Sequence, residues 1–147
     1  MSPAPDTSAA SGAGRAARTP DVHAALIRIH ERYAATPEAR ARLVHPYTLS
    51  PHEAVRLVAC LAGGSLPYTD DAEPSVQGAD LVAALCLLPL LRAEADDLEL
   101  ALLTMARGEG LTWAQLADRL GLDSGQEVQQ RHESLNRGGP APADGAP

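Results

Sequence analysis

Apolar residues recur at helical spacing along most of the chain. Between Val22 and Ala35 they fall at steps of four, three and four, and within residues 51–62 apolar pairs again lie three and four residues apart. Steps of three and four place side chains on one face of a helix. No stretch alternates apolar and polar residues over the length of a strand with enrichment in β-branched residues. The pattern therefore predicts an all-α fold. The two predicted stripes are Val22, Leu26, Ile29 and Tyr33, and Ala54, Leu57, Val58 and Leu61.

Boundary residues mark where several of these helices begin and end. Thr36-Pro37 ends the first helix, and a turn or two can follow it. Ser50 is a good N-cap, Pro51 suits the first helical position, and Glu53 completes a capping box. Gly63-Gly64 then ends that helix. The sequence predicts a well-defined helix between these signals.

The second half of the chain predicts two further helices: one over residues 81–93, which includes Pro89, and one that begins at Glu94. Asp80 is expected to cap the first, which is apolar on all sides and therefore buried. Pro89 should kink or end it, because proline lacks the backbone donor that a helix needs. Four carboxylates from Glu94 to Glu99 then suit the first turn of the next helix. The expected inward stripe of that helix is Leu98, Ala101, Leu102 and Met105.

Composition divides the 147 residues into a helical domain and two tails. Residues 1–20 and 138–147 are rich in Pro, Ala, Ser and Gly without an apolar period, so we expect them to be disordered. The helical N-terminal part, 21–92, would carry a dimer or effector surface. Residues 93–137 would form a helix-turn-helix part. The fold expected is a small helical domain with a C-terminal helix-turn-helix and disordered tails.

The segment from Gly110 to His132 has the spacing of a helix-turn-helix. Thr112 can cap a short helix, and Ala117 is small where two helices must approach each other. Gly121 follows four residues later, where a positive φ is cheap only for glycine. Ser124 can then cap a second helix, with Glu127 as its capping-box partner. Hairpins of this shape with no role in nucleic-acid binding also exist, so the spacing alone leaves both interpretations open.

The stretch 98–135, LELALLTMARGEGLTWAQLADRLGLDSGQEVQQRHESL, also carries a family resemblance. Its residues fit E-x-x-L-I-x-x-A-R-x-x-G-x-S-W-x-x-I-A-x-x-L-G-[VL]-x-S-R-Q-A-A-x-x-R-[YH] at Glu99, Leu102, Leu103, Ala106, Arg107, Gly110, Trp113, Ala117, Leu120, Gly121, Ser124, Gln126, Arg131 and His132. That pattern is typical of small actinobacterial helix-turn-helix regulators of the heat-shock-18 transcriptional regulator type, which the C-terminal region resembles. The resemblance implies a DNA-binding transcriptional regulator.

The chain departs from that pattern where DNA contacts are expected. The family's S-R-Q-A-A stands here as Ser124-Gly125-Gln126-Glu127-Val128, so a basic residue has become glycine. The segment 107–137 carries four arginines (107, 119, 131, 137) against five acids (109, 118, 123, 127, 133). Neutralising phosphates supplies most non-specific DNA affinity, so a two-fold dimer that doubles the surface is expected. Arg15 and Arg18 could add a basic arm.

Seven residues are the candidate DNA contacts. Glutamine can pair with the major-groove edge of adenine, and arginine with guanine or phosphate. An ordinary polar helix surface would also explain the glutamines. The candidates are Ser124, Gly125, Gln126, Gln129, Gln130, Arg131 and Arg137.

Other chemistry finds little support in the sequence. The five histidines lack metal-ligand spacing, and no serine lies in a nucleophile-elbow glycine pattern, so we expect no metal, no cofactor and no enzyme activity. Cys60 and Cys86 are read as free thiols of a reducing cytosol, with a disulfide as the alternative. The longest apolar run, 81–91, is shorter than the roughly twenty residues that span a bilayer. A cytoplasmic protein is expected.

Two functional hypotheses follow, and both involve transcription. In the first, the protein binds double-stranded DNA through its helix-turn-helix as a homodimer. In the second, a degenerate helix-turn-helix binds or sequesters a protein of the transcription machinery. The net charge of −7 suits the second hypothesis, because an acidic surface mimics or repels DNA.

Overall fold

A computed structural model describes residues 20–138, and every described element is helical. The all-α prediction is confirmed. The predicted tails fall almost wholly outside the described residues, as do Arg15 and Arg18. The helices are α1 (Val22–Tyr33), α2 (Pro37–Arg40), α3 (Pro51–Ala62), α4 (Gly78–Gly108), α5 (Trp113–Leu120) and α6 (Gly125–Gly138).

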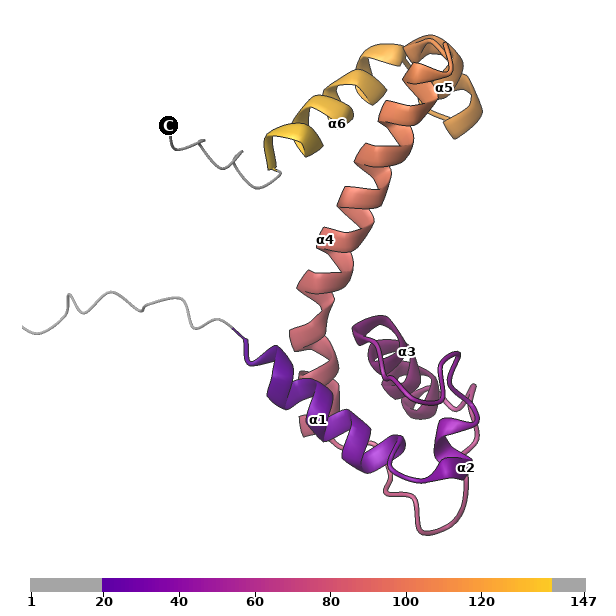
Figure 1. The fold of residues 1–147 in the computed structure, drawn as a ribbon, viewed down its shortest axis with the longest axis vertical. Coiled ribbons are helices and arrows are strands. Elements are labelled where there is room, and N and C mark those ends of the chain that lie inside the picture. The colour runs from indigo at the N-terminus through magenta and orange to yellow at the C-terminus, as the bar shows by residue number, and fades with distance from the viewer. Residues whose placement is uncertain (1–19, 139–147) are drawn as a thin grey trace, which may run out of the picture.

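Helix α4 joins two separate packing units (Figure 1). Helices α1, α2 and α3 gather around its N-terminal end, and we call residues 20–87 the lobe. Helices α5 and α6 pack at its C-terminal end, and we call residues 99–138 the head. The middle of α4 extends between them. The fold therefore holds the head away from the lobe on a single helix.

The lobe buries the apolar stripes that the sequence predicts. Ile29 and Tyr33 of α1 are fully buried, and Leu57, Val58 and Leu61 of α3 pack in the same cluster. Asp21, Thr36 and Ser50 cap the starts of α1, α2 and α3 through their side chains. Glu53 departs from the predicted capping box, because its carboxylate accepts a hydrogen bond from Val44 N instead.

A buried carboxylate stands at the centre of the lobe. Asp80 is fully inaccessible and lies in the first turn of α4, so the prediction that it is the N-cap is wrong; Gln77 takes that position. Asp80 accepts hydrogen bonds from Arg28 Nε (2.8 Å), Tyr33 Oη (2.9 Å) and Gln77 N (2.8 Å). Arg32 Nε also lies 2.8 Å from Oδ1, without hydrogen-bond alignment.

These partners decide the ionisation of Asp80. Burial alone would raise its pKa, but the hydrogen bonds from Gln77, Tyr33 and Arg28 and the charge of Arg32 outweigh burial and lower it. The carboxylate is therefore ionised and ties α1 to the start of α4. A second ion pair in the lobe joins Arg42 to Glu73 of the α3–α4 loop. Arg42 also donates a hydrogen bond to Tyr33 O (2.8 Å) at the end of α1.

Pro89 does not break the helix that contains it, so the prediction of two helices is wrong. Helix α4 runs unbroken through 31 residues and crosses the expected boundary between 92 and 93. Pro89 and Leu85 are both exposed, so water can hydrogen-bond to the carbonyl that proline leaves without its helical donor. The carboxylates of Glu94 to Glu99 consequently lie in the middle of a helix, not in a first turn.

The predicted inward stripe of this helix is also wrong. Leu98, Leu102 and Met105 are all more than half exposed. The head instead packs on Leu100, Leu103 and Ala106. Both sets have helical spacing, so the sequence pattern alone could not decide which face the head covers. The apolar face that carries Leu98, Leu102 and Met105 is therefore exposed to solvent.

Candidate nucleic-acid interface

A small apolar core holds the head together. Leu116 and Ala117 of α5 and Val128 and Leu135 of α6 pack on Leu103 of α4, and these five are buried. Ala117 is 2% exposed, which fits the predicted close approach of helices at a small residue. Leu120, at the end of α5, is 58% exposed and lies outside this core. The helices α5 and α6 thus form a hairpin fixed against the end of α4.

Capping residues position both helices of the hairpin. Thr112 accepts from Gln115 N (3.1 Å), and Gln115 Oε1 accepts from Thr112 N (2.8 Å). Gly121 ends α5 with φ +70°, a left-handed conformation that glycine adopts without strain. Ser124 Oγ accepts from Glu127 N (3.3 Å), as an N-cap of α6 should. The predicted caps at Thr112 and Ser124 are therefore present, but the Glu127 carboxylate accepts no hydrogen bond from Ser124 N, so the predicted capping box of α6 is incomplete.

Gly125 has a steric role that the sequence did not predict. A Cβ at this position would lie 2.7 Å from Ala114 N and 2.9 Å from Trp113 C, both backbone atoms of α5. Only glycine allows the start of α6 to approach α5 this closely. The glycine that stands in place of the family's basic residue therefore permits tight packing between α5 and α6, which a basic side chain would prevent. Any contact of Gly125 with DNA stays a prediction and would involve the backbone.

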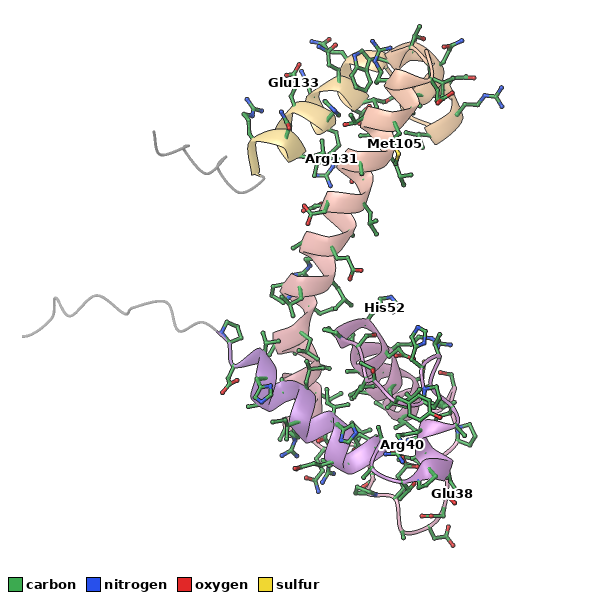
Figure 2. The ribbon with its side chains drawn as sticks, viewed as in Figure 1. Glu38, Arg40, His52, Met105, Arg131 and Glu133 are labelled. Carbon is green, nitrogen blue, oxygen red and sulfur yellow. The ribbon has the colours of Figure 1, made fainter. Side chains whose placement is uncertain are left out.

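The predicted glutamines lie on the outside of α6. Gln126, Gln129 and Gln130 are all exposed, whereas Val128 between them faces the core. Gln129 Nε2 donates to Glu133 Oε1 (3.0 Å), one turn further along the helix. Figure 2 shows Glu133 on the side of α6 that faces away from α4. The outer surface of α6 is therefore polar and open, with glutamine in its first two turns.

Arg131 belongs to a different face of α6. It points at α4, where Nη2 lies 2.8 Å from both Asp96 Oδ1 and Glu99 Oε2 and Nε lies 3.1 Å from Glu99 Oε1 (Figure 2). The hydrogen bonds to Glu99 raise the pKa of Arg131 above its ordinary value, because they outweigh desolvation, which lowers it. The three side chains are half-exposed and link the two helices. In the free chain, Arg131 therefore holds α6 against α4.

A second polar cluster closes the other end of the head. The guanidinium of Arg107 lies over the Trp113 ring, 4.7 Å from its centroid, and donates to Leu111 O. His132 packs against the same ring at 5.3 Å between centroids. Thr104 Oγ1 donates to Leu100 O (2.8 Å), so it accepts from His132 Nε2 at 3.1 Å. Trp113, Arg107 and His132 therefore connect all three helices of the head.

These contacts change the electrostatics of the surface. All four arginines in 107–137 are exposed, but Arg107 and Arg131 are engaged by other residues of the protein. Arg119 and Arg137 make no side-chain hydrogen bond or ion pair within residues 20–138. Sequence reasoning missed Asp96 and Glu99 as partners of Arg131, because it placed them at a helix start. The one available signal was spacing: on an unbroken helix, 96, 99 and 103 share a face.

The rest of the described chain holds few alternatives to this surface. Cys60 and Cys86 are both free thiols. Within residues 20–138, no group of three or more His, Cys, Asp or Glu side chains is arranged to hold a metal ion. None of the helices in that range combines the length and apolarity needed to cross a bilayer.

Comparison with known protein families, curated proteins and solved structures gave no match to this chain. The resemblance of 98–135 to heat-shock-18 type regulators therefore stays a prediction that rests on the quoted residues alone.

Proposed function

We propose that the protein binds double-stranded DNA through α6 and acts as a transcriptional regulator. The observation that carries the proposal is the exposed surface that Gln126, Gln129 and Gln130 form on the first two turns of α6. The start of this helix is capped by Ser124. A major groove admits an α-helix, and a glutamine amide matches the donor and acceptor pair of adenine. The hairpin with α5 supplies the rigid support that a helix inserted into a groove needs.

Phosphate contacts would come from the exposed arginines. Arg137 lies in the last turn of α6 and Arg119 in the last turn of α5, so they bracket the glutamine surface along the chain. Two arginines per copy neutralise few phosphates, and exposed acids lie nearby. We therefore expect weak non-specific affinity with a shallow salt dependence, and a need for two copies on one site.

The experiment is a fluorescence-anisotropy titration of the full chain against labelled duplex DNA at two salt concentrations. Each neutralised phosphate contributes about −0.9 to the slope of log K against log salt. Arg137→Glu should weaken binding to all sequences and reduce the slope by about 1. Arg56→Glu, the same charge change at an exposed position of α3, should leave binding unchanged. No binding at low salt would contradict the proposal.

Arg131→Glu is not a clean test of DNA binding. The substitution would place a third carboxylate beside Asp96 and Glu99 and detach α6 from α4. Loss of DNA binding in that variant would therefore report the position of the head as well as any contact with phosphate.

A second candidate function is binding to a protein of the transcription machinery. It is favoured by the exposed leucines at the α5–α6 turn, Leu120 and Leu122, together with the engagement of Arg107 and Arg131. Saturable binding to a purified component such as a sigma factor, lost in Leu120→Glu and retained in Leu85→Glu, would support this function. That result without salt-dependent DNA binding would replace the first proposal.

A further inference from the structure

We infer that a second copy of this chain pairs with the open face of α4 in antiparallel orientation. The face consists of two rows that repeat every seven residues: Leu88, Ala95 and Leu102, and Leu91, Leu98 and Met105. A seven-residue apolar repeat on two interleaved rows is the pattern of a coiled-coil seam. We call these six residues the seam.

In the structure of one chain, Leu88 and Leu91 of the seam are partly exposed and its other four residues are exposed. Leu98, Leu102 and Met105 are 57%, 63% and 58% exposed. Figure 2 shows Met105 on the side of α4 that faces away from α6, so the head does not cover it. Three large exposed apolar side chains on adjacent turns of one helix face form a continuous patch, unlike the single surface leucines of an ordinary monomer. A partner that supplies apolar knobs at the same repeat would bury them.

The lobe decides the orientation of the second copy. Ala84 lies seven residues before Leu91, on the same face of α4, and is buried against α1 and α3. The lobe thus occupies the continuation of the seam toward the N-terminal end. A parallel partner helix would have to run through the lobes of both copies. An antiparallel partner helix instead ends there, because α4 stops at Gly108, close after Met105.

Charge also selects the antiparallel pairing. In it, Leu88 meets Met105 of the second copy, Leu91 meets Leu102, and Ala95 meets Leu98. This register places Arg92 beside Glu99 of the second copy, twice by symmetry, since these flanking positions face each other in antiparallel pairs. A parallel pairing in register would instead place Glu94 beside Glu99 of the second copy. Opposite charges attract and like charges repel at these flanking positions.

The pairing does not depend on DNA binding, but it deepens the proposed function. The head packs on the face of α4 that carries Glu99 and Leu103, which flanks the seam on one side. Equivalent flanking positions of two antiparallel helices lie on the same side of the pair. Both α6 helices would therefore lie on one side of the dimer, where one duplex can reach both. The tests below use no DNA, so their failure is distinct from failure of the proposed function.

The first test measures oligomeric state by sedimentation over a concentration series. The full chain should be a dimer, and Leu102→Glu should weaken the dimer by more than about tenfold, because a seam position would bury a charge. The matched control is Leu85→Glu, which is 61% exposed on the same helix but outside the seam, and it should leave the dimer intact. A monomeric full chain, or dissociation by Leu85→Glu alone, would overturn the inference.

The second test measures orientation by disulfide crosslinking in a Cys60→Ser/Cys86→Ser background. Leu88→Cys and Met105→Cys proteins should each fail to crosslink alone and should crosslink to each other when mixed. In the antiparallel register each position is about 26 Å from its own equivalent, at about 1.5 Å per residue. Crosslinking of either protein with itself would show parallel pairing and overturn the orientation.

Discussion

The lobe and the head use different means to reach a fixed structure. Ten buried residues from α1, α3 and α4 form the lobe core, and the ionised Asp80 lies inside it with two arginines and a tyrosine. The head has five buried residues and places its polar ties, such as Arg131 with Asp96 and Glu99, at the surface. The lobe therefore directs its polar chemistry inward, whereas the head keeps an outward polar face on α6.

This difference suits the lobe to a stabilising role and the head to the recognition proposed for it. A buried, hydrogen-bonded carboxylate cannot meet a ligand without unfolding the lobe, so the lobe is suited to anchor α4. An exposed amide row on a capped helix contributes little to folding and is free for a partner. The lobe and the head share α4 but not a core, so substitutions in each should have separable effects. Trp113 is the one tryptophan of the chain and lies in the head, so its fluorescence reports on that region alone.

The largest effect is expected in the lobe, from Asp80→Asn. The amide keeps the size of the carboxylate but leaves Arg28 and Arg32 without their counter-charge. Removing one partner of a buried pair costs about 3–5 kcal/mol, and we expect about 3 kcal/mol because both arginines can turn toward solvent. Urea unfolding followed by far-UV circular dichroism measures it. Asp71→Asn, at an exposed position of the α3–α4 loop, is the control and should change stability little.

A smaller effect is expected in the head from Gly125→Ala. The added Cβ would press on the backbone of α5, at Ala114 N, which cannot turn aside as a side chain can. Overpacking of this kind costs about 1–3 kcal/mol. The transition seen by Trp113 fluorescence should move to lower urea. Gly108→Ala has open space around the new Cβ and serves as the control. Equal stability of the two variants would contradict the packing role of Gly125.

Acid should lower the stability of the lobe, and it should do so more in the unmodified chain than in the Asp80→Asn variant. The folded pKa of Asp80 lies below its ordinary value of about 3.9, so folding favours the ionised form. The pKa of Glu73 is lowered too: burial opposes the shift, and hydrogen bonds from Arg42 and Thr69 outweigh it. The stabilisation is present above about pH 4 and is lost as the pH falls through the folded pKa values. Urea midpoints should fall over that range, and less steeply in Asp80→Asn.

Sequence reasoning succeeded where a single local rule decides the structure. The caps at Ser50, Thr112 and Ser124 and the left-handed Gly121 each depend on the residue itself and its near neighbours. Pro89 was misread because its cost depends on exposure, which the sequence does not state. The inward face of α4 was misread because two apolar faces compete, and the choice depends on where a distant hairpin docks. The ion pairs of Arg131 with Asp96 and Glu99 could not be predicted for the same reason.

The central claim is that the glutamine surface of α6 reads DNA bases, and the most direct measurement compares the full chain with Gln126→Ala/Gln130→Ala. Duplexes selected from a random pool by the full chain provide the test site. The double variant should bind the selected site at least about tenfold more weakly, since each good base contact is worth about 1–3 kcal/mol. Its binding to unselected duplex should not change. Equal affinity of the two proteins for the selected site, or a selection that enriches no sequence, would contradict the account.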